Sequence, residues 1–218
     1  MEIVMTGPTE AVAAIHNAFR HDMELIDSAA LGAARGESGC DATIERIQFL
    51  EEVLDWHAAG EDVVIHPLLE SVAPSVYETY ERDHRALDAA FDALNRAVAV
   101  GDLLETARAT KACKFHLDLH LDKEDAHMYR LIRERVPIPE QGEAIALMAS
   151  HAPQERFADV VAWMFPLIGD NDRVNMTRSW QMGMPPEGFA AASALIESAA
   201  GDGWIELTRQ IPELVGAP

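Results

Sequence analysis

HAAGED, at residues 57–62, is the stretch that decides the fold, and its pattern returns as HLDKED at residues 120–125. Each stretch reads histidine, three intervening residues, glutamate and then aspartate. On an α-helix, residues four apart lie one above the other on the same face. Each stretch therefore directs an imidazole and a carboxylate at one point, an arrangement typical of metal ligands.

The segments upstream of these stretches also share a pattern. His16 and His84 are each followed by apolar residues at the third, seventh and tenth positions. The apolar residues are Phe19, Met23 and Ile26 after the first histidine, and Leu87, Phe91 and Leu94 after the second. The chain thus contains one helix pair twice: a helix with one histidine, followed by a helix with His-x3-Glu.

Amphipathic periodicity, caps and prolines predict four long helices with short connections, and strand-like alternation is absent from the sequence. The predicted helices run from Thr9 to Gly32, from Asp41 to His66, from Pro74 to about Gly101, and from Asp102 to Pro137. We expect Pro67 to end the second helix. The predicted fold class is all-α, with an antiparallel up-and-down four-helix bundle over residues 9–136, in which sites are built in the core from facing helices.

Beyond the fourth helix, residues 137–218 contain shorter apolar segments separated by prolines and glycines. We predict helices over 141–148, 154–167, 172–182, 187–197 and 204–215, as a C-terminal extension packed on the bundle. The large apolar side chains of this part need burial and indicate core rather than a cofactor site. They are Trp163, Met164, Phe165, Trp180, Met182 and Met184.

Composition limits the classes of partner. The 218 residues carry a formal net charge of −20, which disfavours nucleic acid and anionic membranes as partners. The N-terminus lacks the features of a signal peptide, and no continuous apolar run reaches about 18 residues. We therefore expect a soluble, cytoplasmic protein. Cys40 and Cys113 are too few for a disulfide framework and are interpreted as two unpaired thiols.

The histidines and glutamates fall on core-facing stripes among apolar residues, where unpaired charge would be costly. This favours a metal site over a structural polar core. Neutral imidazole and carboxylate suit iron, manganese or zinc, and two glutamates from opposite helices could bridge two metals while histidines fill terminal positions.

As a set, these residues resemble the hemerythrin/HHE cation-binding family, a non-haem diiron four-helix bundle with histidine on helices one and three and His-x3-Glu on helices two and four. The resemblance covers about residues 9–136. It implies that Glu61 and Glu124 bridge two iron ions, joined by an oxo or hydroxo group, with zinc or manganese as other possible metals. The implied ligands are His16, His57, Glu61, His84, His120 and Glu124.

One position departs from the family's oxygen carriers, which have a second histidine four residues before the one on helix three. Here that residue is Tyr80. Tyr80 could coordinate iron, donate a hydrogen bond beside a ligand, or pack in the core, and we predict that it coordinates one ferric ion. His116 could support a ligand or become one, and Asp125 competes with Glu124 as the bridge. His21, His66 and His151 fit no ligand position.

A ferritin-like site is an alternative bundle interpretation, since it needs Glu-x2-His on two helices and a lone glutamate on the other two. Glu81 with His84, and Glu124 with His127, satisfy the first requirement formally. Helix two fits poorly, because Glu61 has Val64 at the third following position and His57 is left without a role.

Three functional hypotheses follow. The first is a diiron oxidoreductase that reacts with hydrogen peroxide, nitric oxide or dioxygen, its only implied partner a small diatomic or peroxide ligand. The second is a protein that binds or senses oxygen, nitric oxide or iron without turnover, together with a protein partner or as a homodimer. The third is a structural helical protein with an adventitious zinc. The replacement of a histidine by Tyr80 favours peroxide or nitric oxide chemistry over oxygen carriage.

Overall fold

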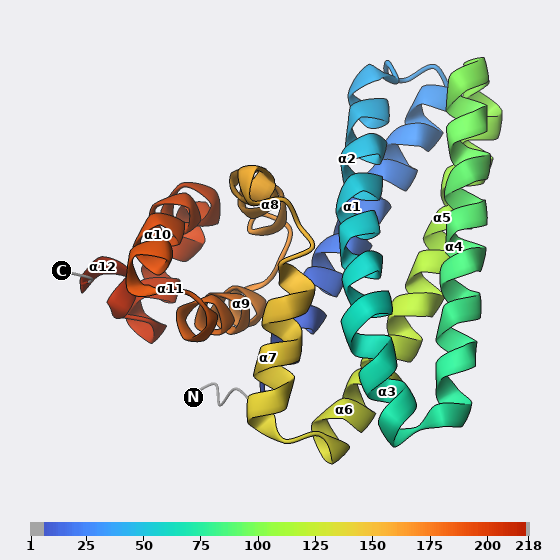
Figure 1. Cartoon of the computed structure of the whole chain (residues 1–218). Coiled ribbons are helices and arrows are strands. Elements are labelled where there is room, and N and C mark those ends of the chain that lie inside the picture. The colour runs from blue at the N-terminus through green and yellow to red at the C-terminus, as the bar shows by residue number, and fades with distance from the viewer. Residues whose placement is uncertain (1–6, 217–218) are drawn as a thin grey trace. The chain divides into compact units, whose positions relative to one another are not determined.

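The structure, a computed structural model, describes residues 7–216 and is helical, with no strand in that range (Figure 1). The predicted all-α fold class is confirmed. The chain forms two compact units, one from Phe19 to Arg135 and one that joins the residues up to Ala18 with those from Val136 onward. None of the helices between residues 7 and 216 combines the length and apolar character that a membrane crossing requires.

The Phe19–Arg135 unit is an antiparallel four-helix bundle (Figure 1). Its long helices are α1 (Glu10–Ala34, from Phe19 onward), α2 (Asp41–Gly60), α4 (Pro74–Val100) and α5 (Leu103–Lys123). The connection from α4 to α5 has a simple local cause. Gly101 adopts the left-handed conformation, with φ 74°, that favours glycine after a helix. Asp102 then caps α5 by accepting hydrogen bonds from the next backbone N–H groups.

The core of the bundle is made of apolar side chains at helical spacing. Burying each one contributes about 1.5–3 kcal/mol of transfer free energy, which offsets the cost of placing charged groups among them. Side chains with at most 1% exposure line the centre: Phe19, Met23, Ile26, Leu50, Ile65, Leu69, Leu94, Leu117 and Leu121.

Two π-helical turns interrupt the bundle, and both begin at the glutamate of a His-x3-Glu stretch. They are η1 (Glu61–Ile65) and η2 (Glu124–Met128). At the end of each turn, the N–H of the next residue bonds to the carbonyl of that glutamate. A π turn holds one extra residue, so it rotates the following residues by about 100° relative to a regular α-helix. The buried face of the helix shifts accordingly: after Glu61, the next buried side chains are those of Ile65, His66 and Leu69.

Both interrupted helices continue after the π turn, as α3 (His66–Val72) and α6 (Tyr129–Arg135). The predicted end of the second helix at Pro67 is therefore wrong. Pro67 lies in the first turn of α3, directly after a turn whose hydrogen bonds have already shifted register. Because the regular α-helical hydrogen-bond pattern is already interrupted there, the absence of an N–H on Pro67 costs no α-helical hydrogen bond. The helix therefore continues to Val72.

The other unit is also helical. It contains α7 (Ile138–Ala149), η3 (Gln154–Arg156), α8 (Phe157–Met164), α9 (Asp170–Gly183), α10 (Pro186–Ala200), η4 (Gly201–Gly203), α11 (Trp204–Gln210) and α12 (Glu213–Gly216). Its core includes Ala11, Ala14 and Ala18 of α1 together with Met164, Phe165, Ile196 and Leu207. Trp163, Trp180 and Met184 pack against this core, as predicted, but Met182 is 64% exposed. The prediction of a buried Met182 is therefore wrong.

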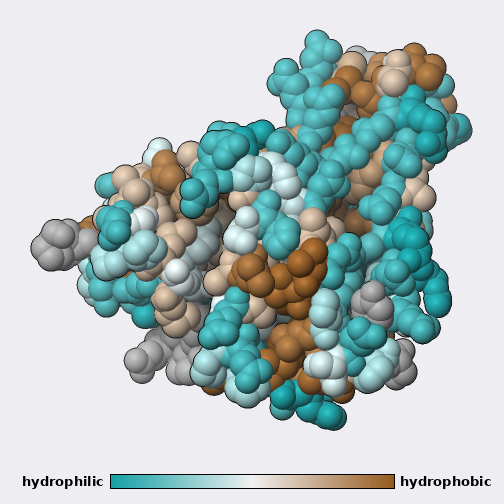
Figure 2. Space-filling view, in the orientation of Figure 1, coloured by the Kyte–Doolittle hydropathy of each residue, from teal (hydrophilic) through white to brown (hydrophobic). Residues whose placement is uncertain are grey.

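The face seen in Figure 2 is largely hydrophilic, with hydrophobic residues gathered in patches between the hydrophilic ones. Such a surface is expected for a chain with 37 acidic and 17 basic residues.

Candidate metal centre

Two carboxylates lie fully buried in the core of the bundle. Glu61 follows α2 and Glu124 follows α5, and both have 0% exposure. The histidine one turn earlier faces each of them. His57 Nε2 lies 3.3 Å from Glu61 Oε1, and His120 Nε2 lies 3.2 Å from Glu124 Oε1. Each His-x3-Glu pair thus converges on one point.

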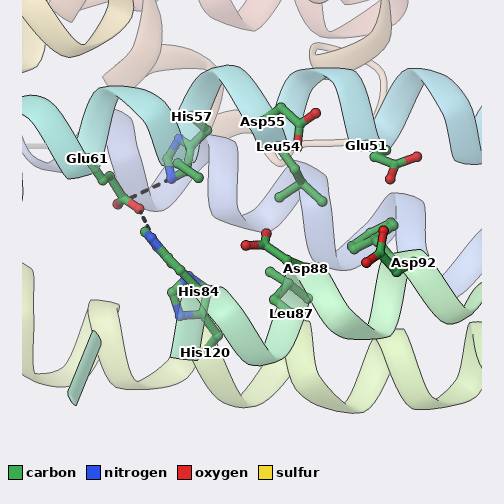
Figure 3. A pocket seen from close by; sticks show the side chains of 12 residues that line it. Glu51, Leu54, Asp55, His57, Glu61, His84, Leu87, Asp88, Asp92 and His120 are labelled. Atoms are coloured by element: carbon green, nitrogen blue, oxygen red, sulfur yellow. Dashed lines mark ion pairs between the residues drawn. The ribbon is translucent and has the colours of Figure 1, made fainter. Parts of the chain in front are cut away.

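His84, from α4, joins the two carboxylates. Its Nε2 lies 3.4 Å from Glu61 Oε2, a pair drawn in Figure 3, and 3.8 Å from Glu124 Oε1. One ligand atom from each of Glu61, His84, His120 and Glu124 lies within 4.8 Å of the other three. Three separate helical segments therefore bring two imidazoles and two carboxylates to one place, which is the donor set that first-row metals bind.

The electrostatics of this cluster are those of crowded buried charge. Burial alone would raise the pKa of Glu61, but His57 and His84 beside it hold that pKa well below its ordinary value. Burial, followed by the charge of Glu61, raises the pKa of Glu124 well above the ordinary value. Burial lowers the pKa of His84, but the neighbouring carboxylates of Asp62, Glu124 and Glu61 outweigh this effect and raise that pKa to about 12. Protons thus balance the charges where a cation would otherwise do so.

Two buried polar atoms of the cluster that make no hydrogen bond also fit a bound metal. Glu61 Oε2 and His84 Nε2 are buried and make no hydrogen bond within the described residues. Leaving such a group unsatisfied costs about 1–3 kcal/mol. A cation coordinated between these atoms would remove that cost, so the residues fit iron, manganese or zinc.

Two neighbours orient the cluster. Asp62 Oδ1 lies 3.0 Å from His84 Nδ1 and 3.0 Å from His66 Nδ1. A carboxylate on Nδ1 fixes a histidine so that Nε2 is directed at a metal. On the other side, the Tyr129 hydroxyl donates a 2.5 Å hydrogen bond to Glu61 Oε1. Burial, followed by the charges of Glu61 and Glu124, raises the pKa of Tyr129 well above its usual value.

Sequence reasoning missed the two residues that follow the π turns, His66 and Tyr129. His66 and Tyr129 occupy equivalent positions, each immediately after a π turn, and both are about 1% exposed. The ring of His66 lies 4.9 Å from that of His84, so it belongs to the surroundings of the site. Extending the comparison of the two repeats by one turn beyond each glutamate would have pointed to both residues.

Tyr80 is buried, and its hydroxyl donates a 3.0 Å hydrogen bond to the Lys123 carbonyl, one residue before Glu124. Burial, followed by the charge of Glu124, raises the pKa of Tyr80 to about 12. The geometry thus matches the hydrogen-bond donor role left open by the sequence. Coordination of ferric iron by Tyr80 stays a prediction.

The competing ligands lie elsewhere. Asp125 pairs with Arg20 at 2.8 Å, which leaves Glu124 as the carboxylate directed into the core. His116 is exposed and stacks edge-on with Phe115, contrary to its predicted place on the inner face. Glu81 and His127 are also exposed, so the ferritin-like arrangement is excluded.

His16 is fully buried on α1, in the part of that helix that belongs to the other compact unit. Its role as a ligand stays a prediction, as does the complete ligand set of six residues and Tyr80.

Comparison with known proteins agrees with this geometry. The family model described as hemerythrin HHE cation binding domain matches residues 7–132, more than half of the chain. The chain belongs to the hemerythrin HHE family. The resemblance inferred from the sequence is confirmed, and the cluster around Glu61 and Glu124 is the candidate metal site of this hemerythrin domain.

Curated relatives of this hemerythrin-family chain are much longer proteins. The zinc finger protein BRUTUS of Arabidopsis thaliana is 26% identical over 180 residues, which cover 79% of this chain and 14% of BRUTUS. A BRUTUS-like zinc finger protein of the same plant is 23% identical over 184 residues, again 79% of this chain and 14% of the relative. The chain therefore spans 14% of the length of these relatives. No solved structure gives a significant match.

Proposed function

We propose that this hemerythrin-family protein holds two non-haem iron ions and reacts with hydrogen peroxide or nitric oxide. The observation that carries the proposal is the pair of fully buried carboxylates, Glu61 and Glu124, with a histidine from each of three helices beside them. When bound, the iron pair supplies the one-electron redox steps that such reactions need.

The donors support two ions rather than one. Each His-x3-Glu pair brings its own imidazole and carboxylate, from α2 and from α5. His84 lies between the two carboxylates and is within 4 Å of both. Each pair would supply an imidazole and a carboxylate to an ion of its own, which supports a pair of ions held in the bundle core.

The remaining side chains hold this set in place. Asp62 aligns His84, and the Tyr129 hydroxyl fixes one oxygen of Glu61. Such outer partners set the orientation and basicity of metal ligands. They also keep the other carboxylate oxygen of Glu61 directed at His84.

The preference for peroxide or nitric oxide over reversible oxygen carriage rests on Tyr80. That position supplies no imidazole, and its hydroxyl is directed at a peptide carbonyl. The donor set therefore has one histidine fewer than the resemblance assigns to oxygen carriers, which favours reaction over stable oxygen binding.

Metal analysis of the purified protein, with an optical spectrum, tests the first half of the proposal. We expect iron at about two ions per chain, since the donors of a two-ion site are present. His57→Ala and His120→Ala should each lower that content. Full iron content in both variants would refute the ligand assignment.

Steady-state consumption of hydrogen peroxide and of nitric oxide tests the second half. The iron-loaded wild type should consume at least one of them, and metal-free His57→Ala, as the matched control, should not. A stable, reversible oxygen complex without consumption of either would instead establish the alternative, a binding or sensing protein.

A further inference from the structure

A cleft of about 260 Å³ runs between α2 and α4 and ends at the metal cluster. His57, Glu61, His84 and His120 line its closed end, as Figure 3 shows. Because a water molecule needs only about 10–15 Å³ of such space, the cleft has room for a hydrated ion. It therefore connects the buried donors with the surface of the bundle.

The outer part of this cleft is lined by four carboxylates: Glu51, Asp55, Asp88 and Asp92. Asp55, Asp88 and Asp92 are exposed, whereas Glu51 is half-buried. We call these four residues the acidic mouth. Leu54, Ala58, Leu87 and Phe91 form apolar walls beside it.

The acidic mouth has a regular spacing that leads to the cluster. Asp92, Asp88 and His84 follow one another at intervals of four residues along α4. Four residues rise by about 6 Å along an α-helix and return to nearly the same face. Glu51 and Asp55 repeat the interval on α2, and Figure 3 shows both pairs around the same cleft. A cation can thus meet a new carboxylate at each turn on its way inward.

The placement of these carboxylates is unfavourable without a cation. Like charges four residues apart on a helix destabilise it, and here two such pairs face one cleft. Burial raises the pKa of Glu51, and the charges of Asp55 and Asp92 add to this effect. Glu51 accepts two hydrogen bonds from Asn95, a neutral partner. Among residues 7–216, no lysine or arginine forms an ion pair with the acidic mouth.

A second, independent observation indicates what the cleft receives. Glu61 Oε2 and His84 Nε2, at its closed end, are buried and make no hydrogen bond within the described residues. This oxygen and this nitrogen face each other at 3.4 Å without a hydrogen bond, and both are donor atoms that a cation could bind, whereas a neutral ligand gains little from four carboxylates at the mouth.

We propose that the acidic mouth is the loading route by which a divalent cation, ferrous iron in the proposed function, reaches the buried centre, with Asp55, Asp88 and Asp92 binding it in passing. The inference rests on the proposed metal centre. The transfer is a ligand exchange without redox change. Carboxylate oxygens replace part of the ion's water shell and are then replaced by the donors at the closed end, while the water is released to solvent.

The test is the rate at which the metal-free 218-residue chain takes up Fe²⁺ under argon, measured by quenching samples with a chromogenic Fe²⁺ chelator. The cleft variant is Asp55→Asn with Asp88→Asn. The matched control is Glu45→Gln with Glu78→Gln, which removes two charges from exposed positions of α2 and α4 outside the cleft. Circular dichroism verifies that each variant is folded.

We expect the cleft variant to load about 10-fold more slowly at low ionic strength, because electrostatic focusing by a charged cleft contributes factors of about 10 or more. Asp88→Lys should slow loading further, and the control should change the rate by less than about twofold, as expected for distant charge. High salt should bring the variants close to wild type. The final iron content should stay that of the wild type.

Equal loading rates for the cleft variant and the control would overturn the inference, as would a rate without salt dependence. A cleft variant whose final iron content falls as far as that of His57→Ala would also overturn it, because Asp55 and Asp88 would then be ligands of the centre. A wild type that takes up no iron at all would refute the proposed function itself, so the two failures are distinguishable.

Discussion

Tyr129→Phe is the substitution whose effect the structure defines best. It removes one hydroxyl and nothing else, from a side chain that is 1% exposed and donates to the fully buried Glu61. The ring stays, so no large cavity forms. A hydrogen bond to a charged group is worth about 1.5–3 kcal/mol, and Glu61 Oε1 loses a donor that water cannot replace. We therefore expect the metal-free protein to lose about 2 kcal/mol of unfolding free energy.

Urea denaturation followed by circular dichroism measures this loss. Tyr80→Phe is the matched control, since it also removes one buried hydroxyl, but one that donates to the neutral Lys123 carbonyl. A neutral hydrogen bond contributes about 0.5–1.5 kcal/mol, so the control should be the milder variant. It should also keep most of its iron. Its optical spectrum tests the predicted ligand role of Tyr80: loss of a phenolate-to-iron band in Tyr80→Phe would support coordination, and an unchanged spectrum would leave Tyr80 as a hydrogen-bond donor.

Metal binding gives a second, independent readout of Tyr129→Phe. Outer partners of metal ligands contribute about 10–100-fold in affinity, and a competition titration should show a loss in that range. If Tyr129→Phe unfolds at the same urea concentration as wild type and binds metal as tightly, then the hydroxyl does not hold Glu61 in solution and our account of the site's orientation is wrong.

Other substitutions test separate parts of the structure. His120→Ala should lower metal affinity by more than the roughly 10–100-fold of an outer partner, while the exposed His116→Ala leaves it unchanged, as competition titration would show. Burial raises the pKa of the Cys113 thiol to about 12, so at neutral pH a thiol reagent should titrate Cys40 in the folded protein and both cysteines only in urea. Asp125→Asn should keep its metal in elemental analysis and lose about 1 kcal/mol, because the Arg20 and Asp125 side chains are 24% and 29% exposed and water screens their attraction in part.

Much of the fold and of the site follows from local patterns in the sequence. Helical periodicity located the four bundle helices, and Gly101 with Asp102 marked the turn between two of them. The His-x3-Glu spacing placed imidazole and carboxylate on one face in both repeats. These features depend on residues within one or two turns of each other, so the sequence by itself determines them.

Features that depend on the rotation of a helix were decided by the tertiary structure. A step of four residues overshoots a full turn by about 40°, so the predicted stripe drifts by about 80° between Glu124 and His116 and leaves that histidine outside. The π turns rotate later residues by about 100° more, which exposes His127 and buries Tyr129.

Contacts between distant segments could not be read from the sequence either. Arg20 pairs with Asp125, Tyr129 with Glu61, and Asp62 with His84, and each pair joins different helices of the bundle. The sequence by itself determined which side chains could bind a metal. Only the packed bundle decided which carboxylate is directed inward and what holds it there, because a buried charge must find its partner among whatever groups the other helices bring into reach.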